Sequence, residues 1–264
     1  MRGDLSHMKA GPTLTIPRPY PSLWALLGYA VTYSYDSPMA LEEHRFKVER
    51  SARYATLGDG RKGITQVWFV CHGYGQLARE FIRNFEILDD GSRLVIAPEG
   101  LSRFYRDGTH GEIGASWMTR EDRASEIEDY IRYLEALYTH VFERVDRDTV
   151  EVVVLGFSQG VATATRWIAH GRVHADHLVL WAQMVPPEFR SREGFRRLRA
   201  LQLILVRGTR DTFVSAEHFA QQRTHLALHG VAAQEIVFEG GHRLDRDTLL
   251  ESATGRKATD QIKP

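Results

Sequence analysis

The stretch VEVVVLGFSQGVATATRWIA, residues Val150–Ala169, decides the fold of this chain. Its first part, Val150–Leu155, is a run of apolar and β-branched side chains, which predicts a strand buried on both faces. The pentapeptide GFSQG follows at Gly156–Gly160, and the small residues after it predict a helix. A G-x-S-x-G pattern between a buried strand and a helix predicts a sharp turn, a nucleophile elbow, that exposes the serine hydroxyl.

Five further apolar runs surround this stretch and alternate with segments of helical periodicity. They are QVWFVC at Gln66–Cys71, RLVIA at Arg93–Ala97, HLVLW at His177–Trp181, LQLILV at Leu201–Val206 and EIVF at Glu235–Phe238. The clearest helix spans about Glu121–Val145, where apolar residues recur on one stripe. Alternating strands and helices predict an α/β fold built on a doubly wound, mostly parallel sheet.

Patterning divides the chain into three parts. Residues 1–40 are rich in proline and show no clear period, so we expect an irregular leader, a candidate for a dispensable segment. Residues 41–254 should form the α/β domain. Its first segment, FKVERSARYATLG at Phe46–Gly58, reads as extended and is expected to form an edge hairpin before the main sheet. Residues 255–264 are a short polar tail.

Composition limits the classes of partner. The 34 basic and 34 acidic residues cancel, so the net charge does not favour nucleic acid, and we expect no stable membrane insertion because no apolar stretch reaches about 20 residues. The single cysteine excludes an internal disulfide.

The apolar run Ser22–Tyr33 follows a segment untypical of targeting sequences, which favours a cytoplasmic location, with secretion as the alternative. A homodimer is compatible with the sequence, which does not determine the oligomeric state.

A nucleophilic serine needs a general base and a carboxylate that orients the base. After this kind of turn the chain order is serine, acid, histidine. Asp211 lies just past LQLILV, and His242 lies just past EIVF, at the edge where open α/β sheets place their ligands. Other histidines, among them His218 and His225 on an expected helix, follow no strand end, and two later aspartates come after His242. We therefore predict a catalytic triad of Ser158, Asp211 and His242.

A glycine-rich loop, HGYGQ at His72–Gln76, follows the strand QVWFVC. Attack on an ester places negative charge on the carbonyl oxygen, which two backbone N–H groups usually receive. We predict that Tyr74 and Gln159, the residue after the serine, provide these oxyanion-hole groups. The alternative is a tight turn with no catalytic duty. Cys71 closes a buried strand and is expected to be a packed, unreactive thiol.

The longest stretch that looks irregular runs from Pro98 to Thr119. Loops of this length often carry function. Its side chains Phe104, Tyr105, Trp117 and Met118 are therefore candidates to line a substrate pocket. The alternative is that they seal the loop onto the body of the domain.

Five motifs, HGYG, APEG, GFSQG, GTRD and GGH, occur in this order between about residues 64 and 245. They resemble the phospholipase/carboxylesterase family of α/β-hydrolases, which includes the acyl-protein thioesterases. The resemblance implies the α/β-hydrolase fold and hydrolysis of esters or thioesters through an acyl-enzyme, with no metal and no other cofactor. Cap domains in this fold are commonly inserted where this chain has only Ala182–Ala200, so we expect no cap domain.

Together these patterns predict a serine hydrolase. The predicted substrate is a small-molecule carboxylic ester with a short to medium acyl chain. Among enzymes, the alternative is a thioesterase or a lysophospholipase. Outside enzymes, the alternative is a catalytically inactive binding module with the same fold.

Overall fold

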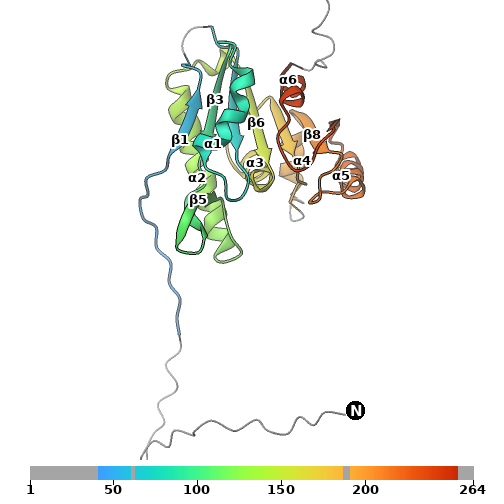
Figure 1. Cartoon of the computed structure of the whole chain (residues 1–264). Coiled ribbons are helices and arrows are strands. Elements are labelled where there is room, and N and C mark those ends of the chain that lie inside the picture. Colours follow the sequence, from blue (N-terminus) through green and yellow to red (C-terminus); the bar gives the residue numbers. More distant parts are fainter. Residues whose placement is uncertain (1–40, 61–62, 187–190, 255–264) are drawn as a thin grey trace, which may run out of the picture. The chain divides into compact units, whose positions relative to one another are not determined.

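The computed structural model describes residues 41–60, 63–186 and 191–254 (Figure 1). Contacts divide the chain into two units, Met1–Glu49 and Arg50–Pro264. Of the first unit only residues 41–49 are described, and these are exposed and form no helix or strand. The described strands and helices all belong to the second unit. The predicted leader, residues 1–40, and the predicted tail, residues 255–264, lie outside the described residues.

A seven-stranded sheet in the order β1-β3-β2-β6-β7-β8-β9 forms the centre of the second unit. β1 is antiparallel to β3, and every other neighbouring pair is parallel. The strands are β1 (Tyr54–Leu57), β2 (Gln66–Cys71), β3 (Arg93–Pro98), β6 (Glu151–Phe157), β7 (His177–Trp181), β8 (Gln202–Gly208) and β9 (Ala233–Phe238). The predicted mostly parallel sheet is confirmed, and all six predicted strands belong to it.

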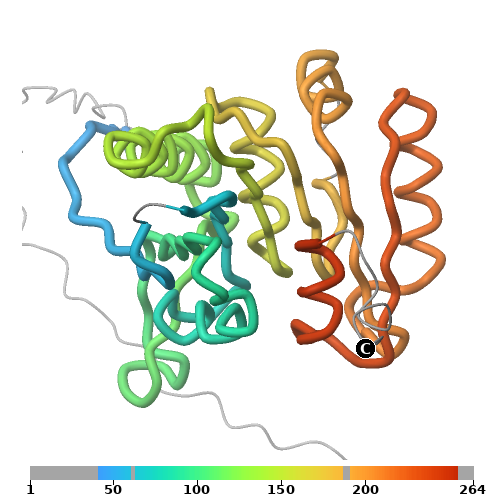
Figure 2. Tube along the Cα trace, turned by 90° about the horizontal axis from the view of Figure 1, so that it is seen from above, coloured from blue at the N-terminus to red at the C-terminus, as the bar shows by residue number. Residues whose placement is uncertain are grey.

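Helices cover both faces of this sheet, as Figure 2 shows. One face packs against α2 (Arg123–Phe142), α3 (Gln159–His170), α4 (Arg192–Arg199) and α5 (Ala216–Leu228). The other face packs against α1 (Ala78–Phe81), the 3₁₀ helix η2 (Ile82–Leu88) and α6 (Arg246–Thr254). A further 3₁₀ turn, η3 (Arg147–Thr149), precedes β6. The sheet is therefore the middle of three layers.

Strand β2 shows why the strands read as unbroken apolar runs. Val67 and Phe69 lie in the core on the α2–α3 side, whereas Trp68 and Val70 lie in the core on the α1–η2 side. Successive side chains of a strand point to opposite faces, and here both faces are covered. All four side chains are fully buried. Each such burial contributes about 1.5–3 kcal/mol, which ties the strand to both layers.

The segment Phe46–Gly58 differs from its prediction. Only Tyr54–Leu57 forms a strand, β1, which pairs with β3, and residues 46–53 contain no strand. The expected edge hairpin is therefore a single edge strand, because its pairing partner is the sheet itself rather than a preceding segment.

The stretch Pro98–Thr119 also differs, since it contains an antiparallel hairpin of β4 (Ser102–Asp107) and β5 (His110–Ser116). Asp107 pairs with His110, so Gly108 and Thr109 form a two-residue hairpin turn, and glycine at the first position of such a turn is a typical short-range signal. Gly108, which follows Asp107, has a φ of 76°, a left-handed conformation that glycine adopts without strain. The prediction of an irregular loop was wrong, because Gly108 allows the tight turn of a hairpin.

The connection between β7 and β8 matches the expectation of no cap domain. Its described residues form a single short helix, α4. In the part of the chain that the structure describes, no helix combines the length and the apolar character needed to span a bilayer.

Candidate active site

Ser158 stands at the turn between β6 and α3, at the carboxyl edge of the sheet. Its backbone has φ 53° and ψ −118°, a left-handed conformation that is strained for any residue with a side chain. Its N–H donates to the carbonyl oxygen of Trp181, at the end of neighbouring β7, at 2.9 Å. This bond holds the strained turn in place and leaves the side chain partly exposed.

The glycines on either side of this turn allow a close approach of backbone segments. A Cβ added at Gly156 would collide with the carbonyl oxygen of Gly160. A Cβ added at Gly160 would collide with the carbonyl oxygen of Cys71 in β2. Only glycine therefore lets α3 start this close to the strands, which explains the G-x-S-x-G pattern in steric terms.

His242 and Asp211 lie beside Ser158. In the sequence, His242 is 84 residues after Ser158 and 31 residues after Asp211. The Nε2 atom of His242 is 3.0 Å from the Ser158 hydroxyl oxygen. The Nδ1 atom is 2.9 Å from a carboxylate oxygen of Asp211, whose side chain is fully buried. Because a carboxylate only accepts hydrogen bonds, Nδ1 carries the proton, and Nε2 is left to accept the serine proton.

The loop after β8 fixes the Asp211 carboxylate. Its second oxygen accepts hydrogen bonds from the backbone N–H groups of Phe213 at 2.8 Å and Val214 at 3.2 Å. The same loop places the Phe213 ring 4.5 Å from the His242 imidazole, centroid to centroid, and Phe157 packs against that imidazole at 5.1 Å. Phe213 is 73% exposed, so its ring forms a lip of the site. Neither phenylalanine was predicted as a site residue.

His72 anchors the loop after β2. Its Nε2 accepts a hydrogen bond from the Gly100 N–H at 2.9 Å, so Nδ1 carries the proton and donates to the carbonyl oxygen of Gly73 at 2.7 Å. Burial lowers the pKa of the fully buried His72 to about 4, against the opposing effect of the bond to Gly73. His72 is therefore neutral at physiological pH and holds this loop through both ring nitrogens.

Within that loop, the backbone N–H groups on either side of Tyr74 already donate hydrogen bonds. The Gly73 N–H donates to the Gln76 side chain at 2.8 Å, and the Gly75 N–H donates to the carbonyl oxygen of Ala115 in β5 at 2.9 Å. The N–H of Tyr74 between them donates to no residue in the described part of the chain. This amide is therefore available to a ligand.

Gln159 is the first residue of α3, where backbone N–H groups lack a partner within the helix. Its side chain amide binds the segment after β5. The oxygen accepts from the Trp117 N–H at 3.2 Å, and the nitrogen donates to the carbonyl oxygen of Met118 at 3.0 Å and to Ser116 at 3.1 Å. The first turn of α3 is thus fixed to the end of the β4–β5 hairpin.

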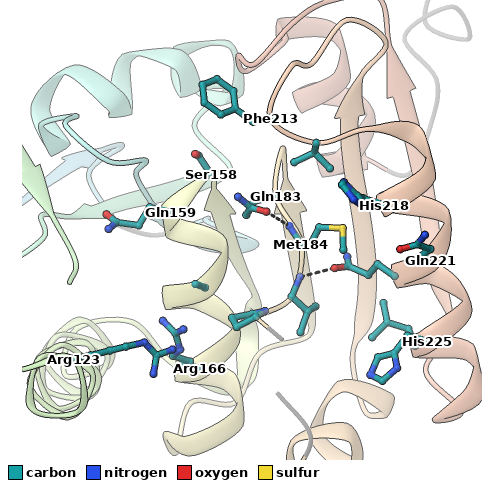
Figure 3. A pocket seen from close by; sticks show the side chains of 16 residues that line it. Arg123, Ser158, Gln159, Arg166, Gln183, Met184, Phe213, His218, Gln221 and His225 are labelled. Carbon is teal, nitrogen blue, oxygen red and sulfur yellow. Dashed lines mark hydrogen bonds between the residues drawn. The ribbon is translucent and has the colours of Figure 1, made fainter. Parts of the chain in front are cut away.

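A cavity of about 770 Å³ opens beside Ser158 and runs between α3 and α5 (Figure 3). Its described lining residues come from α2, α3, α5 and the segments after β7 and β8: Arg123, Ser158, Gln159, Ala162, Arg166, Gln183, Met184, Val185, Pro186, Phe213, Val214, His218, Gln221, Gln222, His225 and Leu226. The volume falls in the range of about 300–1,000 Å³ typical of small-molecule sites.

The four side chains predicted as pocket candidates lie elsewhere. Trp117 is buried and donates from its indole to the His72 carbonyl oxygen at 2.8 Å. Phe104 stacks on the Tyr74 ring, and Tyr105 is half exposed on the hairpin. Met118 contacts Arg166 through its sulfur. None of the four belongs to the described lining of the cavity beside Ser158.

Helix α5 supplies lining residues that sequence analysis missed. His218, Gln221, Gln222 and His225 are spaced at i, i+3, i+4 and i+7, so they lie on one face of the helix. The signal in the sequence was this set of polar residues, which recurs at helical spacing on one face of α5. It was not used because none of these residues follows a strand end.

Cys71 does not offer a second nucleophile. It is fully buried, and burial raises the pKa of its thiol far above the usual range. The thiol therefore stays protonated, and the thiolate is the reactive form. Among the described residues, no group of three or more histidine, cysteine, aspartate or glutamate side chains is arranged to hold a metal ion.

No protein-family model matches this sequence, and no curated protein sequence matches it. Solved structures do match. Acyl-protein thioesterase 2 of Zea mays is 19% identical with a TM-score of 0.57, and the match covers 76% of this chain and 96% of that one. The Bacillus cereus carboxylesterase is 16% identical with a TM-score of 0.54, over 76% of this chain and 91% of that one. A phospholipase/carboxylesterase from Dyadobacter fermentans is 15% identical with a TM-score of 0.55, over 79% and 98%.

At these identities the likeness establishes the fold. The chain has the α/β-hydrolase fold. Its sheet order and the helices on both faces agree with this assignment. The predicted fold class is confirmed.

Proposed function

We propose that this α/β-hydrolase-fold protein is a serine hydrolase that cleaves carboxylic esters through an acyl-enzyme. The observation that carries the proposal is the hydrogen-bonded line from Ser158 through His242 to Asp211, with distances of 3.0 and 2.9 Å. The resemblance of its motifs to the phospholipase/carboxylesterase family supports the same conclusion. The neighbours named carboxylesterase and phospholipase/carboxylesterase share its fold.

In the proposed first half-reaction, the Ser158 oxygen attacks the carbonyl carbon of the ester while His242 Nε2 takes the serine proton. Asp211 holds the imidazole in its tautomer and stabilises the imidazolium that forms. The carbonyl oxygen becomes negative and accepts hydrogen bonds from the N–H groups of Tyr74 and Gln159. Collapse of this intermediate breaks the bond to the alcohol oxygen, which receives the proton from His242.

In the proposed second half-reaction, water attacks the acyl group on Ser158 and His242 takes a proton from that water. The same two N–H groups receive the charge. Collapse breaks the bond to the Ser158 oxygen, which takes the proton back from His242, and the carboxylic acid leaves. Every proton is returned, so the protein's own residues complete the cycle.

A panel of soluble ethyl and p-nitrophenyl esters tests this proposal, with thioesters of the same acyl groups as a second arm because one neighbour is named a thioesterase. The wild-type protein should hydrolyse short-chain oxygen esters, and Ser158→Ala should not. Equal turnover by the two proteins, or no turnover of any ester, would overturn the proposal. The latter result would favour a binding module.

A further inference from the structure

The end of β5 lies against both parts of the predicted oxyanion hole. The Ala115 carbonyl oxygen accepts from the Gly75 N–H at 2.9 Å, and the Trp117 indole donates to the His72 carbonyl oxygen at 2.8 Å. These two bonds hold the loop on either side of Tyr74, whose own N–H donates to no residue in the described part of the chain. The loop that carries the first expected donor is therefore fixed to the end of β5 at two points.

The second expected donor, the N–H of Gln159, is held from the same place through its own side chain. The side-chain oxygen accepts from the Trp117 N–H at 3.2 Å, which fixes which end of the amide is oxygen. The side-chain nitrogen donates to the Ser116 hydroxyl at 3.1 Å and to the Met118 carbonyl oxygen at 3.0 Å. Because three partners surround one planar amide, they fix where Gln159, and with it the first turn of α3, lies relative to β5.

The residues that make these contacts are closely packed. Residues 115–117 are all buried. Neighbouring backbone lies directly on them: a Cβ added at Gly100 would collide with the Ser116 carbonyl oxygen, and a Cβ added at Gly114 would collide with the Gly75 carbonyl oxygen. Interiors packed to this density leave no room for small independent shifts. A change in this segment would therefore move the partners of both expected donors.

We propose that the side chain of Gln159 is a positioning group, which sets the distance between the two N–H groups that receive the oxyanion. This inference rests on the proposed ester hydrolysis. The developing oxyanion needs donors at about 2.7–3.1 Å, whereas the neutral carbonyl of the bound ester is a weaker acceptor. A displaced donor therefore raises the barrier more than it weakens substrate binding. Figure 3 shows the Gln159 side chain pointing away from His218 and Gln221 on the opposite wall, so its amide faces the hairpin.

Gln159→Met tests the assignment, because methionine has a similar length and helix propensity but cannot donate a hydrogen bond and accepts only weakly. Removal of a whole oxyanion donor costs about 10²–10³ in kcat. A displaced donor should cost less, so we expect kcat for a soluble ethyl ester to fall at least about tenfold while KM changes less than about twofold. An unchanged kcat, or a change in KM alone, would overturn the inference.

Gln66→Met is the matched control. Gln66 begins β2 at the opposite edge of the sheet, where its side-chain oxygen accepts from Trp68 at 3.1 Å and Arg93 at 2.9 Å and its nitrogen donates to Glu151 at 3.0 Å. The same substitution therefore removes a similar set of hydrogen bonds far along the strand from the expected oxyanion hole. It should lower the melting temperature, as Gln159→Met does, and leave kcat unchanged. A parallel loss of kcat in both variants would reduce the effect to general stability and contradict the assignment.

Inhibition by a trifluoromethyl ketone isolates the oxyanion from the later steps. The Ser158 oxygen adds to the ketone carbon, the serine proton passes to His242, and the former carbonyl oxygen keeps the negative charge. The inhibition constant should rise at least about tenfold in Gln159→Met and stay unchanged in Gln66→Met. An unchanged inhibition constant in Gln159→Met would overturn the inference even if kcat fell.

Ser116→Ala removes one partner of the Gln159 amide from the β5 side and decides the question if Gln159→Met does not fold. It should lower kcat about threefold or more at unchanged KM, the ratio that one neutral hydrogen bond supplies, and an unchanged kcat would then overturn the inference. The wild-type protein separates the two proposals. Ester hydrolysis with kcat retained in both variants would refute the positioning role and keep the hydrolase. A wild-type protein that neither hydrolyses esters nor binds the trifluoromethyl ketone would refute both.

Discussion

The N–H of Gly100 donates to Nε2 of His72 across 2.9 Å and so joins the loop after β3 to the loop after β2. The other ring nitrogen of His72 is 2.7 Å from the Gly73 carbonyl oxygen. A protonated imidazole has two N–H donors and could no longer accept from Gly100. The neutral imidazole is therefore part of what positions the loop that carries Tyr74.

This arrangement predicts a specific pH dependence of stability. Burial lowers the pKa of His72 from 6.5 to about 4 in the folded protein. Between these values the unfolded chain binds a proton that the folded protein does not, so stability falls as the pH falls. Over this window the wild-type protein should lose up to roughly 3 kcal/mol more unfolding free energy than His72→Gln, which cannot titrate there. Urea denaturation at several pH values measures this, and identical losses would exclude His72 as the cause.

The Asp211 carboxylate should set the tautomer of His242. Asp211→Asn keeps an oxygen for the Phe213 and Val214 N–H groups but turns an amide N–H toward Nδ1, which favours the wrong tautomer. We expect kcat for ester hydrolysis to fall by about 10⁴ with the fold retained, by analogy with serine proteases. Steady-state kinetics beside a thermal melt measures both effects. A loss below tenfold would point to a different acid.

We expect that a residue with a side chain cannot replace Gly160 without a steric clash at the turn. Alanine there would gain about 1 kcal/mol of helix propensity, but its Cβ would collide with the Cys71 backbone, and overpacking typically costs about 1–3 kcal/mol or more when backbone must shift. We expect Gly160→Ala to be destabilised. Gly241→Ala is the matched control, because the nearest atom to its added Cβ is 3.6 Å away. Melting temperatures compare them, and equal values would contradict the steric argument.

The fold was predictable from sequence because the inner strands of its sheet are buried on both faces. Their unbroken apolar runs, such as Val67–Cys71, cannot be accommodated in a half-exposed sheet. Chain order and strand ends were enough to select Ser158, Asp211 and His242 as candidates, and the structure brings these three within hydrogen-bonding distance. Parallel strands end at one edge, so residues far apart in sequence are gathered there.

The cavity was not predictable in the same way. Which face of α5 lines it depends on how the helix rotates against α3 and the segment after β7, and no periodicity in a single segment encodes that. The predicted pocket candidates were aromatic residues in and just after the β4–β5 hairpin, but Trp117 bonds to the His72 backbone and Phe104 stacks on Tyr74. Side chains that pack against one another are not available to a substrate.

Reaction with a fluorophosphonate probe, followed by peptide mass spectrometry, tests the central claim most directly, because the probe modifies only a serine that a neighbouring base activates. The wild-type protein should carry one adduct, on Ser158, and His242→Ala should react far more slowly. A wild-type protein that remains unmodified, or that carries its adduct on another serine, would contradict the account.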